Sequence, residues 1–356
     1  MRVRDLARLM AGLGPWADGS PGPATILREV RFPTSAGSSP AWLYAPTSGP
    51  PRRAWLLSPG LHHEQAGDPR MDRFARVLAG AGALVLSPSL PDLTRLLLHP
   101  RVIDDLAAAF AALLAQPELP AGCRPAVFSI SVGSLAALRL AADPRVSAVV
   151  TFGGYASPAG LLRSVTRLHH ETQEPFDPLN APLALLALAE HLPPAHDPAA
   201  LTAAWTRFVR LSWPRPAMKT GGAHLPFAHE LAVAVHPADR ERFLMGCGAR
   251  PGARALVDDV LARGGADALD PRPHLGRIAG AVHVMHGRAD PTIPFSELAA
   301  LDAALPAHVP RRLYATGLYS HTGATGAREL LRNLPALAGE ARTLLGLAST
   351  LAQLGG

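Results

Sequence analysis

The amino-acid sequence predicts an α/β protein with a mostly parallel central sheet, helices on both faces of the sheet, and an inserted helical lid. Short, continuously apolar runs alternate with segments whose apolar residues recur at helical spacing. This alternation is typical of parallel strands that are buried on both faces and joined by helices. It stops after Gly154 and resumes near residue 280, which indicates a long insertion between two consecutive strands.

The expected elements of the core fill most of the chain outside that insertion. Two extended pieces, 28–34 and 41–46, flank a polar turn and predict an antiparallel hairpin. Further strands are predicted at 54–60, 83–90, 125–131, 147–154, 281–287 and 310–317, and helices at 71–82, 102–116, 134–143, 296–304 and about 325–354.

The insertion contains helix-like pieces and no convincing strand. These pieces lie at 183–191, 200–213 and 253–265, and Asp197-Pro198 before the second is a typical N-cap and first-turn pair. A helical block between consecutive strands would lie over the carboxyl edge of a parallel sheet, where such folds bind ligands. The predicted organisation is therefore 1–154 as the first part of the core, 155–279 as the lid, and 280–356 as the second part of the core.

The composition indicates a folded globular protein, because 48% of the 356 residues are hydrophobic and 17% are charged. The net charge is +6, yet the basic residues are scattered arginines, with Lys219 as the only lysine and no run of five or more. Affinity for nucleic acid needs clustered positive charge. We therefore expect no nucleic-acid partner.

Several further features point to a soluble, cytoplasmic protein. Cys123 and Cys247 form neither a disulfide framework nor a metal cluster, which fits a reducing compartment. The start of the chain lacks the apolar core of a secretion signal, since Asp5 and Arg8 interrupt it. No uncharged apolar run approaches the roughly 18 residues that would span a bilayer. The sequence does not indicate an oligomeric state.

The segment VFSISVGSLAAL, residues 127–138, raises the question of catalysis. A predicted strand runs directly into a predicted helix, and Ser131 stands at the corner. A nucleophilic serine needs exposure on such a tight turn, a base to take its proton, and N–H donors for the oxyanion. The residues two before and two after it must be small, and Ser129 and Gly133 are small. The alternative is that Ser131 only caps the helix.

Two later segments favour catalysis. Asp290 follows the strand predicted at 281–287, and His321 follows the one predicted at 310–317. A serine, an acid and a histidine thus each follow a parallel strand, so all three are expected at the same edge of the sheet. The alternative for Asp290 is that it only caps a turn, with Asp267 or Asp270 supplying the acid.

With these residues the chain resembles the α/β-hydrolase family over about 28–154 and 280–325. S-I-S-V-G is similar to the nucleophile elbow, H-G-R-A-D-P-T-I-P to the acid segment and S-H-T-G to the histidine loop. The resemblance implies Ser131 as nucleophile, Asp290 as the orienting acid and His321 as the base. It also implies that the backbone N–H groups of Val132 and Leu61 form the oxyanion hole. The chain departs from the family pattern with Pro59-Gly60 in place of His-Gly and with Ser129 in place of glycine.

The expected activity is hydrolysis of carboxylic esters of small to medium apolar acyl groups through an acyl-enzyme, without a cofactor or metal. His62 and Tyr155 are the candidate substrate contacts. Two alternatives stay open: an acyltransferase or thioesterase with the same triad, and a catalytically silent binding protein.

Other motifs in the sequence carry no functional prediction. His229-Glu230 resembles H-E-x-x-H, but Val233 stands where the second histidine is needed. The metal-capable residues 169–174 have no recognisable ligand spacing. Leu201, Trp205 and Val209 form a helical stripe, which favours packing over substrate contact. No phosphate-binding glycine motif is present.

Overall fold

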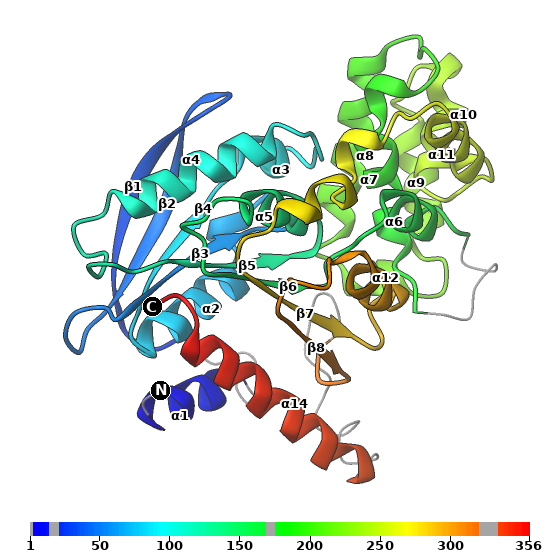
Figure 1. Ribbon diagram of the computed structural model, residues 1–356. Helices are drawn as coiled ribbons and strands as arrows, with labels where there is room; N and C mark the ends of the chain where they lie inside the picture. Colours follow the sequence, from blue (N-terminus) through cyan, green and yellow to red (C-terminus); the bar gives the residue numbers. More distant parts are fainter. Residues whose placement is uncertain (1–2, 14–20, 169–174, 320–333) are drawn as a thin grey trace.

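A computed structural model describes residues 3–13, 21–168, 175–319 and 334–356 (Figure 1). Its centre is an eight-stranded sheet in the order β1-β2-β4-β3-β5-β6-β7-β8. The strands are β1 (Thr25–Thr34), β2 (Gly37–Pro46), β3 (Arg53–Ser58), β4 (Ala83–Pro88), β5 (Ala126–Ile130), β6 (Ala148–Phe152), β7 (Ala281–Gly287) and β8 (Arg311–Thr316). The first two form the predicted hairpin, β2 also runs antiparallel to β4, and every later pairing is parallel.

Helices cover both faces of the sheet, as the sequence predicts. The helices of one face are α1 (Val3–Leu13), α2 (Pro69–Gly80) and α14 (Leu334–Gln353); those of the other are α4 (Val102–Leu114), α5 (Ser134–Leu140) and α12 (Ser296–Ala304). The short α3 (Pro91–Thr94) precedes α4. Continuously apolar strands such as β4 are buried along their whole length, because both faces of the sheet are covered. The predicted α/β class, with a mostly parallel sheet covered by helices on both faces, is confirmed.

Between β6 and β7 the described residues contain helices and no strand, and we name residues 155–279 the helical insertion. Its helices are α6 (Pro158–Val165), α7 (Ala181–Ala187), α8 (Pro198–Ser212), α9 (His224–Ala232), α10 (Pro237–Gly246) and α11 (Ala253–Ala262). They gather at one end of the sheet (Figure 1). The predicted N-cap is confirmed, because the Asp197 side chain accepts a hydrogen bond from the Ala200 N–H at 2.9 Å.

The element boundaries follow the sequence closely, with a few omissions. The strand at 281–287 and the helix at 296–304 match β7 and α12 residue for residue. Five of the described α-helices, α1, α3, α6, α9 and α10, were not predicted; α10 mixes charged and apolar residues without a clean stripe. The predicted last helix begins at about 325, whereas only 334–353 of it falls within the described residues. No helix in the described part of the chain is both long and apolar enough to cross a membrane.

Candidate active site

Ser131 lies on a sharp turn between a strand and a helix. β5 ends at Ile130, residues Ser131–Gly133 form a single 3-10 turn (η3), and α5 starts at the next residue. The φ angle of Ser131 is +55°, one of three positive φ values at non-glycine residues in the described chain. A side chain in this region costs free energy and needs surrounding structure to hold it. The strand-to-helix corner predicted from the sequence is therefore present, with the backbone strain that such an elbow requires.

Gly133 shows why this turn needs small residues. A Cβ atom on Gly133 would lie 2.4 Å from the Pro59 carbonyl oxygen and 2.8 Å from that of Ser58. The Ser58 hydroxyl also donates to the Gly133 carbonyl at 2.9 Å. The loop after β3 and the elbow after β5 are thus locked together by close backbone contact, which brings Leu61 next to the serine.

Ser129 occupies the position where the family pattern has glycine. Its side chain is buried, and its hydroxyl makes no hydrogen bond within the described residues. The elbow at Ser131 nevertheless adopts its left-handed conformation. The extra CH₂OH group is therefore accommodated, at the cost of one buried hydroxyl that finds no partner there.

The two expected oxyanion donors lie beside Ser131. Leu61 and Val132 both line the same cavity as the serine. Val132 is in the first turn of the helix that begins at the elbow, where an N–H group has no intrahelical partner. Among the described residues, neither of these two N–H groups donates a hydrogen bond to protein. Both are available to a substrate oxygen.

Asp290 lies just beyond the carboxyl end of β7, with 5% of its surface exposed. Its Oδ1 atom accepts hydrogen bonds from the Thr292 N–H at 2.8 Å and the Ile293 N–H at 2.9 Å. These bonds fix the orientation of the carboxylate and stabilise its charged form. The loop after β7 thus holds a carboxylate at the edge of the sheet to which Ser131 also belongs.

His286 supports this acid loop and was not singled out by the sequence analysis. It is completely buried, and its Nε2 atom lies 3.0 Å from the Ile293 carbonyl oxygen and 3.7 Å from Asp290 Oδ2. A carbonyl can only accept, so Nε2 carries the proton and donates it there. The sequence signal was a histidine near the end of a largely apolar strand, at the first position of the segment H-G-R-A-D-P-T-I-P.

His321 lies outside the described residues, as does the segment 169–174. β8, which precedes His321 in the chain, runs parallel to β7 and pairs with it up to Thr316. The assignment of His321 as the base therefore stays a prediction from the sequence.

A cavity of about 420 Å³ opens at Ser131. One side of it, the sheet wall, belongs to the core, and the other, the insertion wall, belongs to the helical insertion. The sheet wall includes Pro59, Gly60, Leu61, Ile130, Ser131, Val132 and Phe152; the insertion wall includes Leu161, Leu162, Val165, Leu183, Ala184 and Ala187. Besides these six aliphatic residues, the insertion contributes Asp177, Asn180, Trp213 and Lys219 to the lining. The aliphatic part of the insertion wall suits a hydrocarbon chain better than a polar group.

Polar residues at the edge of the cavity connect the insertion to the acid loop. Lys219 pairs with the buried Asp177 at 2.7 Å, and the Asn180 amide donates to the Thr292 hydroxyl at 3.0 Å. The Asp177 N–H also donates to the Pro291 carbonyl at 3.1 Å. These contacts join residues that lie far apart in the sequence. The local sequence around each residue does not predict its partner.

Of the two predicted substrate contacts, the structure places one at the cavity. His62 lines it and stacks on Trp213, the residue that ends α8, with ring centroids 5.4 Å apart. Burial lowers the pKa of His62 below its usual value, which favours the neutral ring. Tyr155, by contrast, is 0% exposed, is not among the cavity residues, and donates its hydroxyl to the Leu269 carbonyl at 2.9 Å. Tyr155 therefore packs inside the protein and does not reach the cavity, in contrast to its predicted role as a substrate contact.

Two other groups of residues also have structural explanations. His62, Glu64 and Asp68 bring possible metal-ligand atoms within 4.8 Å of one another. However, the Asp68 carboxylate already pairs with Arg70 at 2.5 Å and caps α2, so its charge is neutralised and we assign it no metal. The stripe of Leu201, Trp205 and Val209 is buried and does not line the cavity, in agreement with packing.

The strand order and the strained serine after β5 together define the α/β-hydrolase fold. No protein-family model matches this chain, and no curated protein matches its sequence. Among solved structures it is similar to an acylaminoacyl peptidase of Pyrococcus horikoshii, with 10% identity and a TM-score of 0.48 over 93% of this chain and 41% of that one. This chain therefore spans about two fifths of the length of that peptidase.

Two esterase structures are similar over most of both chains. An esterase of Pyrococcus furiosus shares 14% identity over 93% of this chain and 92% of that one, with a TM-score of 0.49. The esterase domain of a Rhodothermus marinus protein shares 16% identity over 89% and 98%, with a TM-score of 0.46. Structural similarity at this level of sequence identity concerns the fold alone. The activity of this chain has to be argued from its own residues.

Proposed function

We propose that this protein is a serine hydrolase that cleaves carboxylic esters of small to medium apolar acyl groups through an acyl-enzyme. The observation that carries the proposal is the strained Ser131, with its φ of +55°, at the mouth of a largely apolar cavity. Backbone strain of this kind costs about 1–3 kcal/mol and persists where function requires it. A serine that only capped the helix would have no need of it.

In the proposed reaction, the Ser131 Oγ attacks the ester carbonyl carbon while its proton passes to His321. The bond to the leaving alkoxide then breaks, and the alcohol departs with that proton. Water next attacks the acyl carbon and gives a proton to His321, which returns it to Oγ as the carboxylic acid leaves. Asp290 accepts the other ring N–H of His321 and so fixes its tautomer.

The backbone N–H groups of Leu61 and Val132 bind the negative oxygen that forms in each step. Each such donor contributes about 2.7–4 kcal/mol to the transition state in comparable sites. Backbone donors are held rigidly by the contact between Gly133 and Pro59 described above. They therefore need no rearrangement as the charge develops.

The helical insertion, with the boundaries 155–279, serves in this proposal as a lid. Its aliphatic side chains line the side of the cavity opposite Ser131. Such a wall selects acyl groups by length and excludes water from the oxyanion. Its polar contacts to the acid loop, through Asp177 and Asn180, couple the lid to the position of Asp290.

A fluorophosphonate probe tests the nucleophile directly. We expect one adduct per chain, located at Ser131 by peptide mass mapping, and none in Ser131→Ala. The matched control is Ser134→Ala, three residues further along, which should label like the wild type. An adduct at Ser129, Ser134 or Ser320, or the absence of labelling in a folded sample, would rule out the assignment.

The acid is tested by Asp290→Asn, which keeps the shape of the side chain and removes its charge. Comparable substitutions in serine triads lower kcat by about 10⁴, and we expect a loss of at least about a hundredfold here. The controls are Asp267→Asn and Asp270→Asn, because Asp267 is exposed and Asp270 pairs with Arg272 at 2.5 Å. Near-normal turnover in folded Asp290→Asn protein would show that the acid lies elsewhere.

A further inference from the structure

A second cleft, of about 1080 Å³, lies between the loop after α3 and the helical insertion. The titratable side chains that line it are mostly basic. Six of its residues are Arg95, His99, Arg101, His191, Arg207 and Arg210, whereas Glu190 is the one carboxylate among the described residues that line it. We name this space the basic cleft.

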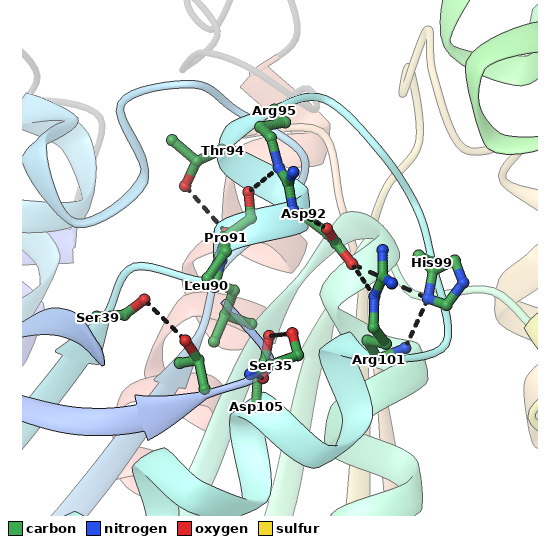
Figure 2. A network of polar contacts seen from close by, with 11 residues as sticks. Ser35, Ser39, Leu90, Pro91, Asp92, Thr94, Arg95, His99, Arg101 and Asp105 are labelled. Atoms are coloured by element: carbon green, nitrogen blue, oxygen red, sulfur yellow. Dashed lines mark hydrogen bonds and ion pairs between the residues drawn. The ribbon is translucent and has the colours of Figure 1, made fainter. Parts of the chain in front are cut away.

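One wall of the basic cleft is built around a buried carboxylate. Asp92, which is 0% exposed, accepts from Arg95 Nη2 at 2.6 Å through Oδ1 and from Arg101 Nε at 3.1 Å through Oδ2 (Figure 2). His99 lies beside them, and its Nδ1 accepts the Arg101 N–H at 3.1 Å. The buried carboxylate of Asp92 thus holds the two guanidinium groups in place, while about half of each arginine side chain stays exposed to the solvent.

The opposite wall is one face of α8. Arg210 extends from this helix toward α3, where its Nη2 atom lies 3.4 Å from the Thr94 carbonyl oxygen. Arg207 is exposed, and within the described part of the chain it makes no hydrogen bond or ion pair. Four guanidinium groups therefore line the cleft with fewer carboxylates around them than positive charges, and a bound anion would balance the excess.

The basic cleft adjoins the cavity at Ser131. Leu98 and Ala187 line both spaces, one from the loop after α3 and the other from the end of α7. A molecule that occupied the basic cleft would therefore lie next to an acyl group bound in the cavity. This adjacency connects the unbalanced positive charge with the substrate of the proposed reaction.

We propose that the basic cleft binds phosphate groups on the portion of the substrate that leaves after attack by Ser131. The inference rests on the proposed function and names its substrate class: acyl esters or thioesters of a phosphate-bearing alcohol or thiol. Several guanidinium forks suit phosphate oxygens, which accept paired N–H bonds and carry more than one charge. The volume exceeds what a single inorganic anion needs and matches a ligand of nucleotide size.

Binding is tested on Ser131→Ala protein, so that no turnover interferes. Titration calorimetry would use coenzyme A, glycerol 3-phosphate and inorganic pyrophosphate as separate probes, because the first carries the phosphates of a nucleotide thiol and the second those of a lipid head group. We expect at least one of the three to bind, and its Kd to rise about tenfold for each of Arg207→Gln and Arg210→Gln, the effect of losing one charged hydrogen bond. Added salt should weaken the same binding.

The matched control is Arg250→Gln. Arg250 is an exposed arginine of the same insertion, it does not line the basic cleft, and no hydrogen bond or ion pair involves it among the described residues. Its substitution should leave the Kd unchanged. The proposal is overturned if none of the three probes binds at millimolar concentration, or if Arg207→Gln and Arg210→Gln bind as tightly as Arg250→Gln.

A kinetic comparison then identifies the substrate portion that the cleft holds. The ratio of kcat/KM for an acyl coenzyme A thioester to that for the p-nitrophenyl ester of the same acid should fall at least about tenfold in Arg207→Gln. An unchanged ratio, with coenzyme A as the bound probe, would contradict the placement. Failure of Ser131 to react with fluorophosphonate would remove the proposed hydrolase activity while leaving the calorimetric result intact, so the two proposals fail separately.

Discussion

The cavity beside Ser131 has two walls that are held in place by different means. The sheet wall depends on backbone atoms in close contact, such as Gly133 against the Pro59 carbonyl oxygen. The insertion wall is attached through side-chain hydrogen bonds together with single backbone bonds, such as that from the Asp177 N–H to the Pro291 carbonyl. The buried Glu297 of α12 accepts from the N–H groups of Ala156 and Ser157 at 2.8 and 3.0 Å, where the insertion leaves the sheet.

This difference matches the demands of the proposed chemistry. Donors for an oxyanion must hold their positions within a fraction of an ångström, and backbone packed against backbone achieves that. A wall that admits and releases substrate has to shift, and a few side-chain hydrogen bonds can be broken and remade at small cost. Substitutions in the two walls should therefore differ in size and in kind.

The largest expected effect is that of Gly133→Ala in the sheet wall. The new methyl group would overlap two carbonyl oxygens that belong to the backbone and cannot rotate away. We expect a loss of about 3 kcal/mol in the free energy of unfolding, the upper end for overpacking. Urea denaturation measures it.

Gly339→Ala is the matched control for that substitution. Gly339 lies inside α14 with nothing within 4 Å of its would-be Cβ atom, so alanine should stabilise the protein by about 0.5–1 kcal/mol. Equal stability of the two variants would show that the elbow is less tightly packed than its geometry indicates.

The stability of the protein should also depend on pH through a histidine in the sheet. His283 of β7 is buried, and burial together with Arg312 lowers its pKa from 6.5 to about 4. The unfolded chain takes up this proton below pH 6.5 and the folded chain does not until about pH 4. Stability should therefore fall by up to about 3 kcal/mol across this window as the pH drops.

The variant His283→Val removes the titrating group and places a β-branched residue in the strand. We expect the change in unfolding free energy between pH 7 and pH 4 to shrink by most of that amount. His308→Gln, at an exposed histidine, should retain the wild-type dependence. If both variants lose stability with falling pH like the wild type, His283 does not carry the effect.

A smaller loss is expected where the insertion joins the sheet. Glu297→Gln replaces the carboxylate oxygen that accepts both N–H groups with a neutral amide oxygen. We expect a cost of about 1–2 kcal/mol, because two buried hydrogen bonds lose the strength that the charge gives them. Because the insertion wall is affected more than the elbow, KM for long acyl esters should change more than the rate of fluorophosphonate labelling. Glu241→Gln, on the exposed face of α10, is the control and should alter neither quantity.

The smallest expected effect is a gain in the free energy of unfolding. Ser131→Gly removes the side chain from a residue with a φ of +55°, and glycine adopts this conformation without strain. We expect the variant to be about 1 kcal/mol more stable than the wild type and inactive. Ser131→Ala keeps the Cβ atom, so it should be inactive without this gain. A destabilised glycine variant would mean that the serine side chain contributes packing that outweighs the strain.

The sequence by itself determined most of the elements of the core and their order. β7 and α12 were predicted residue for residue because the signals for a short strand and for the helix after it are local. The elbow was predicted for the same reason, since small residues around a serine between a strand and a helix form one short pattern. The positions of Ser131 and Asp290 at strand ends followed from chain order alone.

Only the tertiary structure decided how residues distant in the sequence meet. Tyr155 follows the sixth strand as a substrate contact would, yet the packing of the insertion buries it and its hydroxyl reaches Leu269. The pairing of Lys219 with Asp177, and the meeting of α8 with the loop braced by Asp92, likewise depend on where the insertion rests on the core. Periodicity within a segment reports which face of it is buried, but carries no information about the partner that buries it.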